Sequence, residues 1–183
     1  MSAARPAATR RWIVVAIVAV VMAGAGAWVS FLRNAPAPPM DFAVATLLAQ
    51  TLPDQANKSI ALERYRGRVL VVNFWATWCP PCIEEMPELS TIATDYAGRG
   101  VEVVGIGVDY PHKIAQFAAK WPVSYQLLVA EKTGYELSRQ LGNRSLGLPY
   151  TVVIDTKGQV AKRILGRFNG KELRAALDSA LSD

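Results

Sequence analysis

The chain has 183 residues, of which 51% are hydrophobic, and a formal net charge of +5. This length suits one globular domain with an appendage. Most of this net charge comes from the first 40 residues, which hold four arginines and no acidic residue, so the remainder carries 16 basic and 15 acidic residues. A nearly neutral remainder argues against nucleic-acid binding, which requires a basic surface.

Residues 12–32 contain no charged side chain. As a helix, this stretch is long enough to cross the ~30 Å hydrocarbon core of a bilayer. Three arginines precede it and one follows it, which by the positive-inside rule places residues 1–11 in the cytoplasm. We expect an uncleaved transmembrane anchor or signal sequence over residues 12–32. A cleaved signal peptide is the alternative, because the small residues at 23–27 offer an A-x-A pattern.

The stretch after the anchor predicts a linker and then the start of a domain. Residues 33–40 are rich in proline and indicate a short, extended linker. The domain itself is expected to span residues 41–183. Its first elements are predicted to be two short strands at residues 42–52 and 59–62, joined as a hairpin by a turn-like Pro-Asp-Gln-Ala-Asn sequence.

The sequence VLVVNFWATWCPPCIEEMP, at residues 69–87, contains both cysteines of the chain. Its apolar start, residues 69–76, is typical of a strand buried on both faces. Apolar side chains at helical spacing over residues 80–96 predict a helix directly afterwards. Cys79 and Cys82 are therefore expected where a buried strand meets the N-terminus of a helix.

The rest of the chain alternates predicted strands with short predicted helices. Strands are expected at residues 101–108, 125–129, 150–155 and 160–165, and helices at residues 113–120, 134–141 and 171–181. This order predicts an α/β domain with a central mixed β-sheet flanked by helices.

The motif Cys79-Pro80-Pro81-Cys82 predicts thiol-disulfide chemistry. A disulfide between the two cysteines closes too small a loop to stabilise a fold much, so reactivity explains the pair better. The partial positive charge at a helix N-terminus favours the thiolate of Cys79, and first-turn positions tolerate Pro80 and Pro81. We expect Cys79 to be the exposed attacking thiol and Cys82 to be the shielded thiol that resolves the mixed disulfide.

Metal binding is the main alternative for the cysteine pair. A structural zinc site needs four ligands, and the chain offers two cysteines and one histidine, His112. A Cu(I) metallochaperone that holds the ion on two thiolates is a further possibility, but no motif places a third ligand near the pair. We expect no cofactor and no metal, and we expect His112 to be a surface residue.

The sequence FWATWCPPC, followed by Pro87 and much later by GLPY at residues 147–150, resembles a known family. This family comprises the TlpA/ResA-like, membrane-anchored thiol-disulfide oxidoreductases of bacteria, which have the thioredoxin fold. The resemblance covers residues 41–183 in element order. It implies a thioredoxin-like domain in which the early hairpin is an N-terminal addition and residues 113–129 are an inserted αβ unit.

The same resemblance implies roles for residues outside the motif. The bond between Leu148 and Pro149 is expected to be cis, which leaves the Leu148 backbone free to pair with an extended substrate segment. Thioredoxin has a buried aspartate at the position of Asn73, and an asparagine cannot accept a proton. Glu85 matches a glutamate of ResA-like proteins. If buried, it would have a raised pKa and would take the proton of Cys82; an exposed surface glutamate is the alternative.

Taken together, these features predict a reductase of disulfides in specific periplasmic proteins. Trp78, Pro80 and Pro81 are expected to contact the substrate. The resemblance suggests clients in cytochrome c maturation or oxidase copper-site assembly, and re-reduction by a transmembrane thiol electron donor. The expected location is the bacterial inner membrane, single-pass, with the catalytic domain in the periplasm. A thiol oxidase or isomerase and a Cu(I) metallochaperone remain the alternatives.

Overall fold

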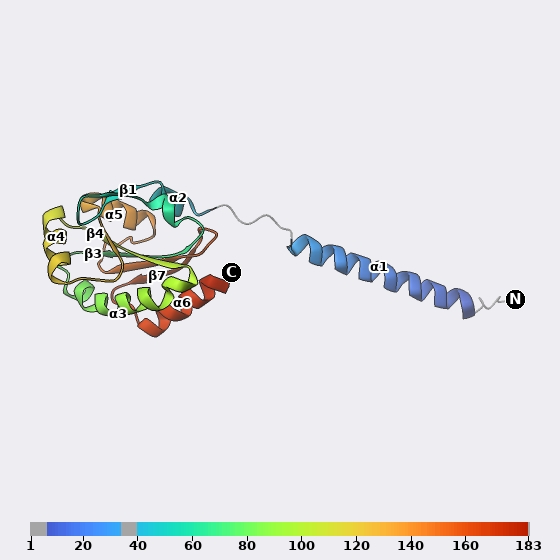
Figure 1. Cartoon of the computed structure of the whole chain (residues 1–183). Helices are drawn as coiled ribbons and strands as arrows, with labels where there is room; N and C mark the ends of the chain where they lie inside the picture. The colour runs from blue at the N-terminus through green and yellow to red at the C-terminus, as the bar shows by residue number, and fades with distance from the viewer. Residues whose placement is uncertain (1–6, 34–39, 183) are drawn as a thin grey trace. The chain divides into compact units, whose positions relative to one another are not determined.

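A computed structural model of the chain describes residues 7–33 and 40–182. The chain divides into two units, Met1–Pro38 and Pro39–Asp183. The described part of the first unit is the helix α1 (Ala7–Arg33), drawn in blue in Figure 1.

Within the part of the chain that the structure describes, no helix is both long enough and apolar enough to cross a membrane. The anchor predicted over residues 12–32 therefore finds no support in the structure and stays a prediction from the sequence. Most of the predicted Pro-rich linker, residues 34–39, lies outside the described residues, as do residues 1–6 of the predicted cytoplasmic segment.

The second unit is an α/β domain built on a five-stranded mixed sheet (Figure 1). The strand order is β5-β4-β3-β6-β7; β3, β4 and β5 run parallel, and β6 runs antiparallel to both β3 and β7. The strands are β3 (Val69–Trp75), β4 (Val101–Gly107), β5 (Gln126–Val129), β6 (Tyr150–Ile154) and β7 (Val160–Leu165). The central strand β3 is buried along its whole length, as its continuous apolar run predicts.

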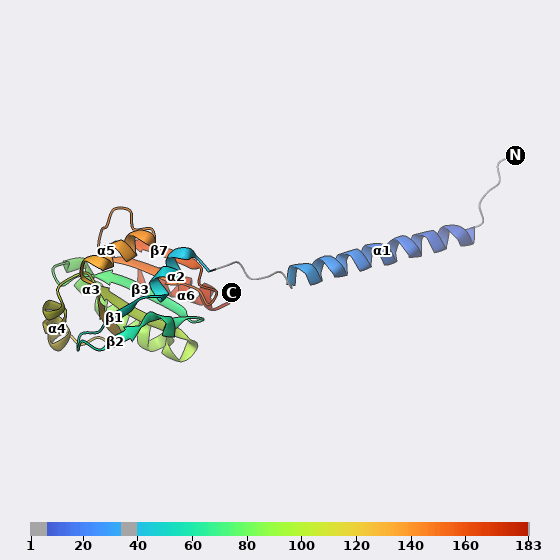
Figure 2. The same ribbon diagram turned by 90° about the horizontal axis from the view of Figure 1, so that it is seen from above.

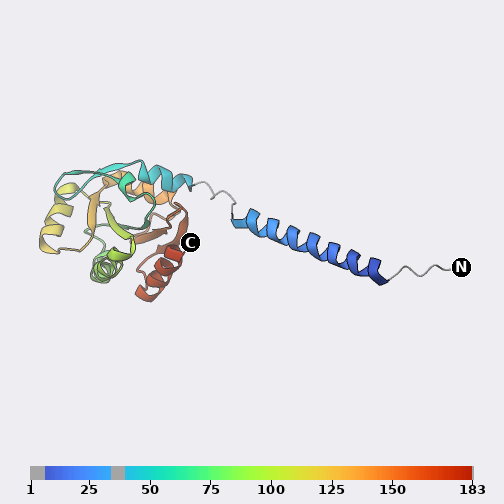
Figure 3. The same cartoon turned by 45° about the vertical axis from the view of Figure 1, so that its right-hand side comes forward.

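Helices cover both faces of this sheet, which confirms the predicted architecture. Figures 1 and 3 show α3 and α6 on one face and α2 and α5 on the other, while Figure 2 looks from above onto the face that α2 and α5 cover. The helices of the domain are α2 (Phe42–Leu48), α3 (Pro80–Tyr96), α4 (Pro111–Lys120), α5 (Glu131–Gln140) and α6 (Gly170–Ser182), with short 3₁₀ turns η1 (Leu62–Tyr65) and η2 (Ala97–Arg99).

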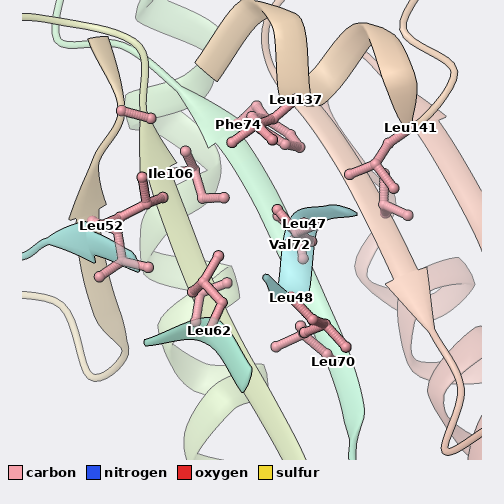
Figure 4. Close-up of a cluster of buried hydrophobic side chains, with 14 of the residues drawn as sticks. Leu47, Leu48, Leu52, Leu62, Leu70, Val72, Phe74, Ile106, Leu137 and Leu141 are labelled. Carbon is pink, nitrogen blue, oxygen red and sulfur yellow. The ribbon is translucent and has the colours of Figure 1, made fainter. Parts of the chain in front are cut away.

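Strand β3 contributes side chains to the apolar core on both sides of the sheet. Leu70, Val72 and Phe74 point into a cluster shared with α2 and α5, which Figure 4 shows in close-up. Val69 and Val71 point the opposite way, into a cluster shared with α3 and α6. Successive side chains of a strand alternate between faces, so a strand this apolar is fixed from both sides. The segment that follows β3 therefore begins from a rigid base.

The predicted N-terminal hairpin is confirmed, but its first strand is shorter than expected. β1 (Thr51–Pro53) and β2 (Ser59–Ala61) pair antiparallel. The residues before β1 form the helix α2 instead of a strand, because Asp41 caps the helix by accepting a backbone hydrogen bond and the apolar residues recur on one helical face. The buried residues of this face are Val44, Leu47 and Leu48.

Candidate active site

Cys79 and Cys82 form a disulfide at the N-terminus of α3. Cys79 is the N-cap residue, and Pro80 and Pro81 are the first two residues of the helix. Prolines fit there because the first N–H groups of a helix have no partner within it. The carbonyl oxygen of Cys79 accepts hydrogen bonds from the N–H groups of Cys82 and Ile83, at 3.1 and 3.2 Å. The cysteine pair is thus fixed on the first helical turn, directly after the buried strand.

The two cysteines differ less in exposure than the sequence suggests. Cys82 is 0% exposed, as expected, but Cys79 is only 4% exposed in this disulfide form. Both belong to an apolar cluster that includes Trp75, Met86 and Ile114. The expectation of an exposed Cys79 is therefore wrong for the oxidised protein, in which Cys79 packs with Cys82 in this cluster. Of the two residues, Cys79 retains the small exposed fraction.

The peptide bond between Leu148 and Pro149 is cis, as the resemblance implies. Pro149 is buried, whereas Leu148 is half-buried and its side chain packs against the cluster that contains the cysteines. The loop that carries this bond therefore lies beside the disulfide, although it follows Cys82 by more than 60 residues in the sequence.

Hydrogen bonds from side chains hold the loop before the cis bond. Asn143 is 2% exposed and donates from Nδ2 to the carbonyl oxygen of Gly147 at 2.9 Å. At the start of the loop, the carbonyl oxygen of Leu141 accepts from Tyr150 Oη at 2.9 Å and from Arg163 Nε at 2.8 Å. Sequence reasoning missed these positioning residues. The only local signal was an asparagine in a segment rich in turn-forming residues.

Glu85 is buried on α3, with 1% of its surface exposed. Its Oε1 accepts a hydrogen bond from Asn73 Nδ2 at 2.7 Å, and its Oε2 accepts one from the backbone N–H of Phe168 at 3.3 Å. Burial raises the pKa of Glu85 to about 7, against the lowering effect of these hydrogen bonds. Its neighbour Glu84 is exposed and pairs with Arg167 instead. Glu85 is therefore a buried carboxyl group with a raised pKa, whereas Glu84 is a surface residue in an ion pair.

Asn73 has a larger part in the site than the sequence indicates. It is 0% exposed on β3, and its Nδ2 also donates to Thr151 Oγ1 on β6 at 3.0 Å. The amide therefore orients the Glu85 carboxyl group from the strand that precedes the cysteines. The signal for this role was one polar residue inside an otherwise apolar strand.

An aromatic pocket is lined by Trp78, the residue that precedes Cys79. Trp78 is 57% exposed and lines a surface pocket of about 170 Å³ together with Tyr110, which is 58% exposed, and Tyr135. Charged residues also border the pocket, among them Lys132. Of the prolines of the motif, Pro80 is exposed and Pro81 is half-buried. The exposed rings of Trp78 and Tyr110 thus offer apolar contact area next to the CPPC motif in the sequence.

His112 lies on the surface, where its ring stacks on Tyr110 with the ring centroids 5.8 Å apart. Among the described residues, no group of three or more His, Cys, Asp and Glu side chains is arranged to hold a metal ion.

Comparison with known proteins shows which family the chain resembles. Residues 34–181 match the family model described as Redoxin. The chain is 30% identical over 130 residues to the thiol-disulfide oxidoreductase ResA of Geobacillus thermodenitrificans, a match that covers 70% of this chain and 72% of the relative.

Solved structures show the same likeness. A thioredoxin-related protein from Neisseria meningitidis serogroup B is 33% identical, with a TM-score of 0.64 over 73% of this chain and 100% of that one. A thiol:disulfide interchange protein of the thioredoxin family from Chlorobium tepidum is 28% identical, with a TM-score of 0.62 over 72% of this chain and 92% of that one.

Proposed function

Since the chain belongs to the Redoxin family and is a thiol-disulfide oxidoreductase of the TlpA/ResA-like kind, we propose that Cys79 and Cys82 are its active-site pair. The observation that supports this assignment is their disulfide on the first turn of α3, beside the loop with the cis bond to Pro149. As a protein-disulfide reductase, the enzyme gives two electrons from its dithiol form to a client disulfide.

The first step is attack by the Cys79 thiolate on one sulfur of the client disulfide. A bond forms between Cys79 and the client, the client S–S bond breaks, and the other client sulfur leaves as a thiolate. The N-terminus of α3 favours the negative charge on Cys79, which is the N-cap residue.

The second step regenerates the disulfide and releases the client. Cys82 gives its proton to the Glu85 carboxylate, and the resulting thiolate attacks Cys79 Sγ. The Cys79–client bond breaks, the Cys79–Cys82 disulfide forms, and the client departs with both of its cysteines reduced. A pKa of about 7 suits Glu85 to accept and then release this proton near neutral pH.

Client binding is proposed to use the surface around the motif. The rings of Trp78 and Tyr110 offer contact area to apolar side chains of the client. Pro80 and Pro81 extend this surface on α3. The backbone of Leu148, next to the buried Pro149, pairs with an extended segment of the client.

The clients and the location are proposed from the sequence and from the resemblance. We propose exported clients in cytochrome c maturation or oxidase copper-site assembly, a transmembrane thiol electron donor, and a domain on the periplasmic side of the bacterial inner membrane. The uncharged stretch at residues 12–32 supports the location. We expect a reduction potential close to that of thioredoxin, about −270 mV. A potential close to that of DsbA, about −120 mV, would instead indicate that the enzyme oxidises its clients.

The test is to trap the mixed disulfide with the full-length Cys82→Ala variant in the native cell envelope. The expected result is a client bound covalently to Cys79 and released by dithiothreitol. The double variant Cys79→Ala/Cys82→Ala is the control and should capture nothing. The proposed role of Cys79 fails if Cys82→Ala traps no protein while Cys79 remains open to alkylation.

A further inference from the structure

Asp109 is a buried carboxyl group that the proposed mechanism does not use. It lies just after β4, and its side chain is only 3% exposed. It is not the N-cap of α4, because that position belongs to Tyr110. Carboxyl groups are rarely buried in proteins unless they are hydrogen-bonded or paired with a charge. The partners of Asp109 therefore indicate what the residue does.

The first partner of Asp109 is Thr77, in the turn between β3 and α3. The Thr77 hydroxyl donates a hydrogen bond to Asp109 Oδ2. Thr77 and Trp78 are the central residues of this turn, which closes where the N–H of Cys79 donates to the carbonyl oxygen of Ala76 at 3.2 Å. Within the described part of the chain, the bond to Asp109 is the only side-chain hydrogen bond of the turn.

The other partners of Asp109 lie at the start of α4. Its Oδ1 accepts a hydrogen bond from the backbone N–H of Tyr110 at 2.8 Å, and Lys113 Nζ lies 3.9 Å from the same oxygen. Lys113 Nζ also lies 5.4 Å from the centroid of the Tyr110 ring, within the range of a cation–π contact. One carboxyl group thus joins the start of α4 to the turn before Cys79.

The two segments that Asp109 joins each supply one exposed ring of the aromatic pocket. Trp78 directly follows Thr77, Tyr110 directly follows Asp109, and all of these except Thr77 line the pocket. Both rings are more than half exposed, so the packing of the fold fixes them only in part. A side chain that must be ordered when a partner binds reduces the affinity. Anchoring the backbone beside each ring lowers this cost.

We propose that Asp109 is a positioning residue for client binding, which holds the Trp78 and Tyr110 rings in the arrangement that an apolar client segment contacts. It acts on Trp78 through the hydroxyl of Thr77, and on Tyr110 through the backbone N–H. Asp109 itself exchanges no proton and forms no covalent bond in the reaction. This inference rests on the proposed function, in which the two rings contact the client.

The variant Thr77→Val tests the link, because valine keeps the branched shape of threonine but has no hydroxyl. The full-length protein is reduced and mixed with a synthetic peptide that holds a disulfide and apolar residues beside both cysteines. Formation of the Cys79–Cys82 disulfide in a single turnover is followed at increasing peptide concentration. With Thr77→Val, we expect the concentration that gives half the maximal rate to rise about threefold to tenfold, as for the loss of one hydrogen bond. The maximal rate should stay as in the wild type.

Two further variants show whether the hydroxyl causes the effect. Thr77→Ser keeps the hydroxyl and should retain the half-saturating concentration of the wild type. Thr91→Val is the matched control: its hydroxyl donates to the carbonyl oxygen of Pro87 within α3, and the residue does not line the pocket. Both of its kinetic values should equal those of the wild type. An equal rise in Thr77→Ser and Thr77→Val would overturn the proposal.

A double-variant cycle shows whether Thr77 acts through Trp78. If it does, adding Thr77→Val to Trp78→Ala has little further effect, because residues that act as a unit are not additive. Asp109→Ala should raise the half-saturating concentration at least as much as Thr77→Val, and adding Thr77→Val to it should change nothing more. Fully additive effects of Thr77→Val and Trp78→Ala would overturn the proposal, whether or not Asp109→Ala folds.

The same measurements separate this inference from the proposed function. If Trp78→Ala raises the half-saturating concentration and Thr77→Val does not, Asp109 does not position the rings, and the proposed function stands. If Trp78→Ala has no effect, the rings do not bind the client, and the positioning role fails with that part of the proposed function. If Cys79→Ala still reduces the peptide, the proposed active-site pair is wrong.

Discussion

Trp78 is a large apolar side chain that the fold leaves 57% exposed, next to the buried Cys79. Exposed tryptophans at a functional surface commonly dominate the binding energy of a protein partner. We predict that Trp78→Ala raises the KM for an oxidised protein client by about tenfold or more, because an aromatic contact of this size is lost. The maximal rate should stay unchanged, as should the rate with a small disulfide that does not reach the pocket.

Trp121 provides a matched control for this prediction. It is 55% exposed, similar to Trp78, but it follows α4 and does not line the aromatic pocket. Steady-state kinetics of Trp121→Ala should therefore match those of the wild type. Equal KM values for the two alanine variants would show that Trp78 does not bind the client.

At the scale of single elements, the loop before Pro149 depends on one buried side chain. Asn143 donates to the carbonyl oxygen of Gly147 at 2.9 Å, and its removal leaves that partly buried acceptor without this partner. We predict that Asn143→Ala lowers the free energy of unfolding by about 1–3 kcal/mol. Urea denaturation measures the effect.

The neighbouring Ser145 tests whether the effect is specific to Asn143. Ser145 is exposed and reaches Asn143 Oδ1 only at 3.4 Å, so Ser145→Ala should change the free energy of unfolding by less than about 0.5 kcal/mol. If both variants unfold alike, the asparagine does not hold the loop in the way described.

The elements that could be predicted from the sequence are those with a long or unambiguous pattern. Strand β3 could be predicted because its apolar run is rich in β-branched residues, and helix α3 because its apolar residues keep a helical spacing over 17 residues. The seven-residue α2 could not be assigned in this way, because a short apolar run fits a strand as well as a helix. Its N-cap, Asp41, was the one local signal available.

In the candidate site, too, some residues could be predicted from the sequence and others could not. Its cysteines and prolines are adjacent in the sequence, so the motif alone indicated the chemistry. The partners of Glu85 are not adjacent: Asn73 precedes it by 12 residues, and Phe168 follows it by 83. Such contacts depend on how β3, α3 and the segment before α6 pack together. No local sequence pattern marks these contacts, so they could not be predicted from the sequence.

At the scale of the whole molecule, stability and redox chemistry are carried by different parts of the chain. The two large apolar clusters on either side of the sheet hold the domain together. The disulfide joins residues only three positions apart, so it restricts the unfolded chain little. The bond can therefore be made and broken in each turnover without unfolding the domain.

Glu85 links the stability of the whole domain to pH. Its pKa is raised to about 7 in the folded protein, against an ordinary value of 4.5. Below pH 4.5 the carboxyl group is protonated in both the folded and the unfolded state, so it does not make the free energy of unfolding depend on pH. Between pH 4.5 and about 7, the folded state retains a proton that the unfolded state has lost, so the free energy of unfolding falls as the pH rises.

We predict that this contribution of Glu85 falls by up to about 3 kcal/mol across that window and is constant above it. Urea denaturation from pH 4 to pH 9 measures the change, and the slope of the curve against pH is the quantity to compare between variants. Glu85→Gln should remove the fall, because glutamine does not titrate. Glu84→Gln should retain it, because the Glu84 carboxylate is exposed. A fall of equal size in Glu85→Gln would show that other groups cause it, and the carboxyl group would then lack the raised pKa that its burial implies.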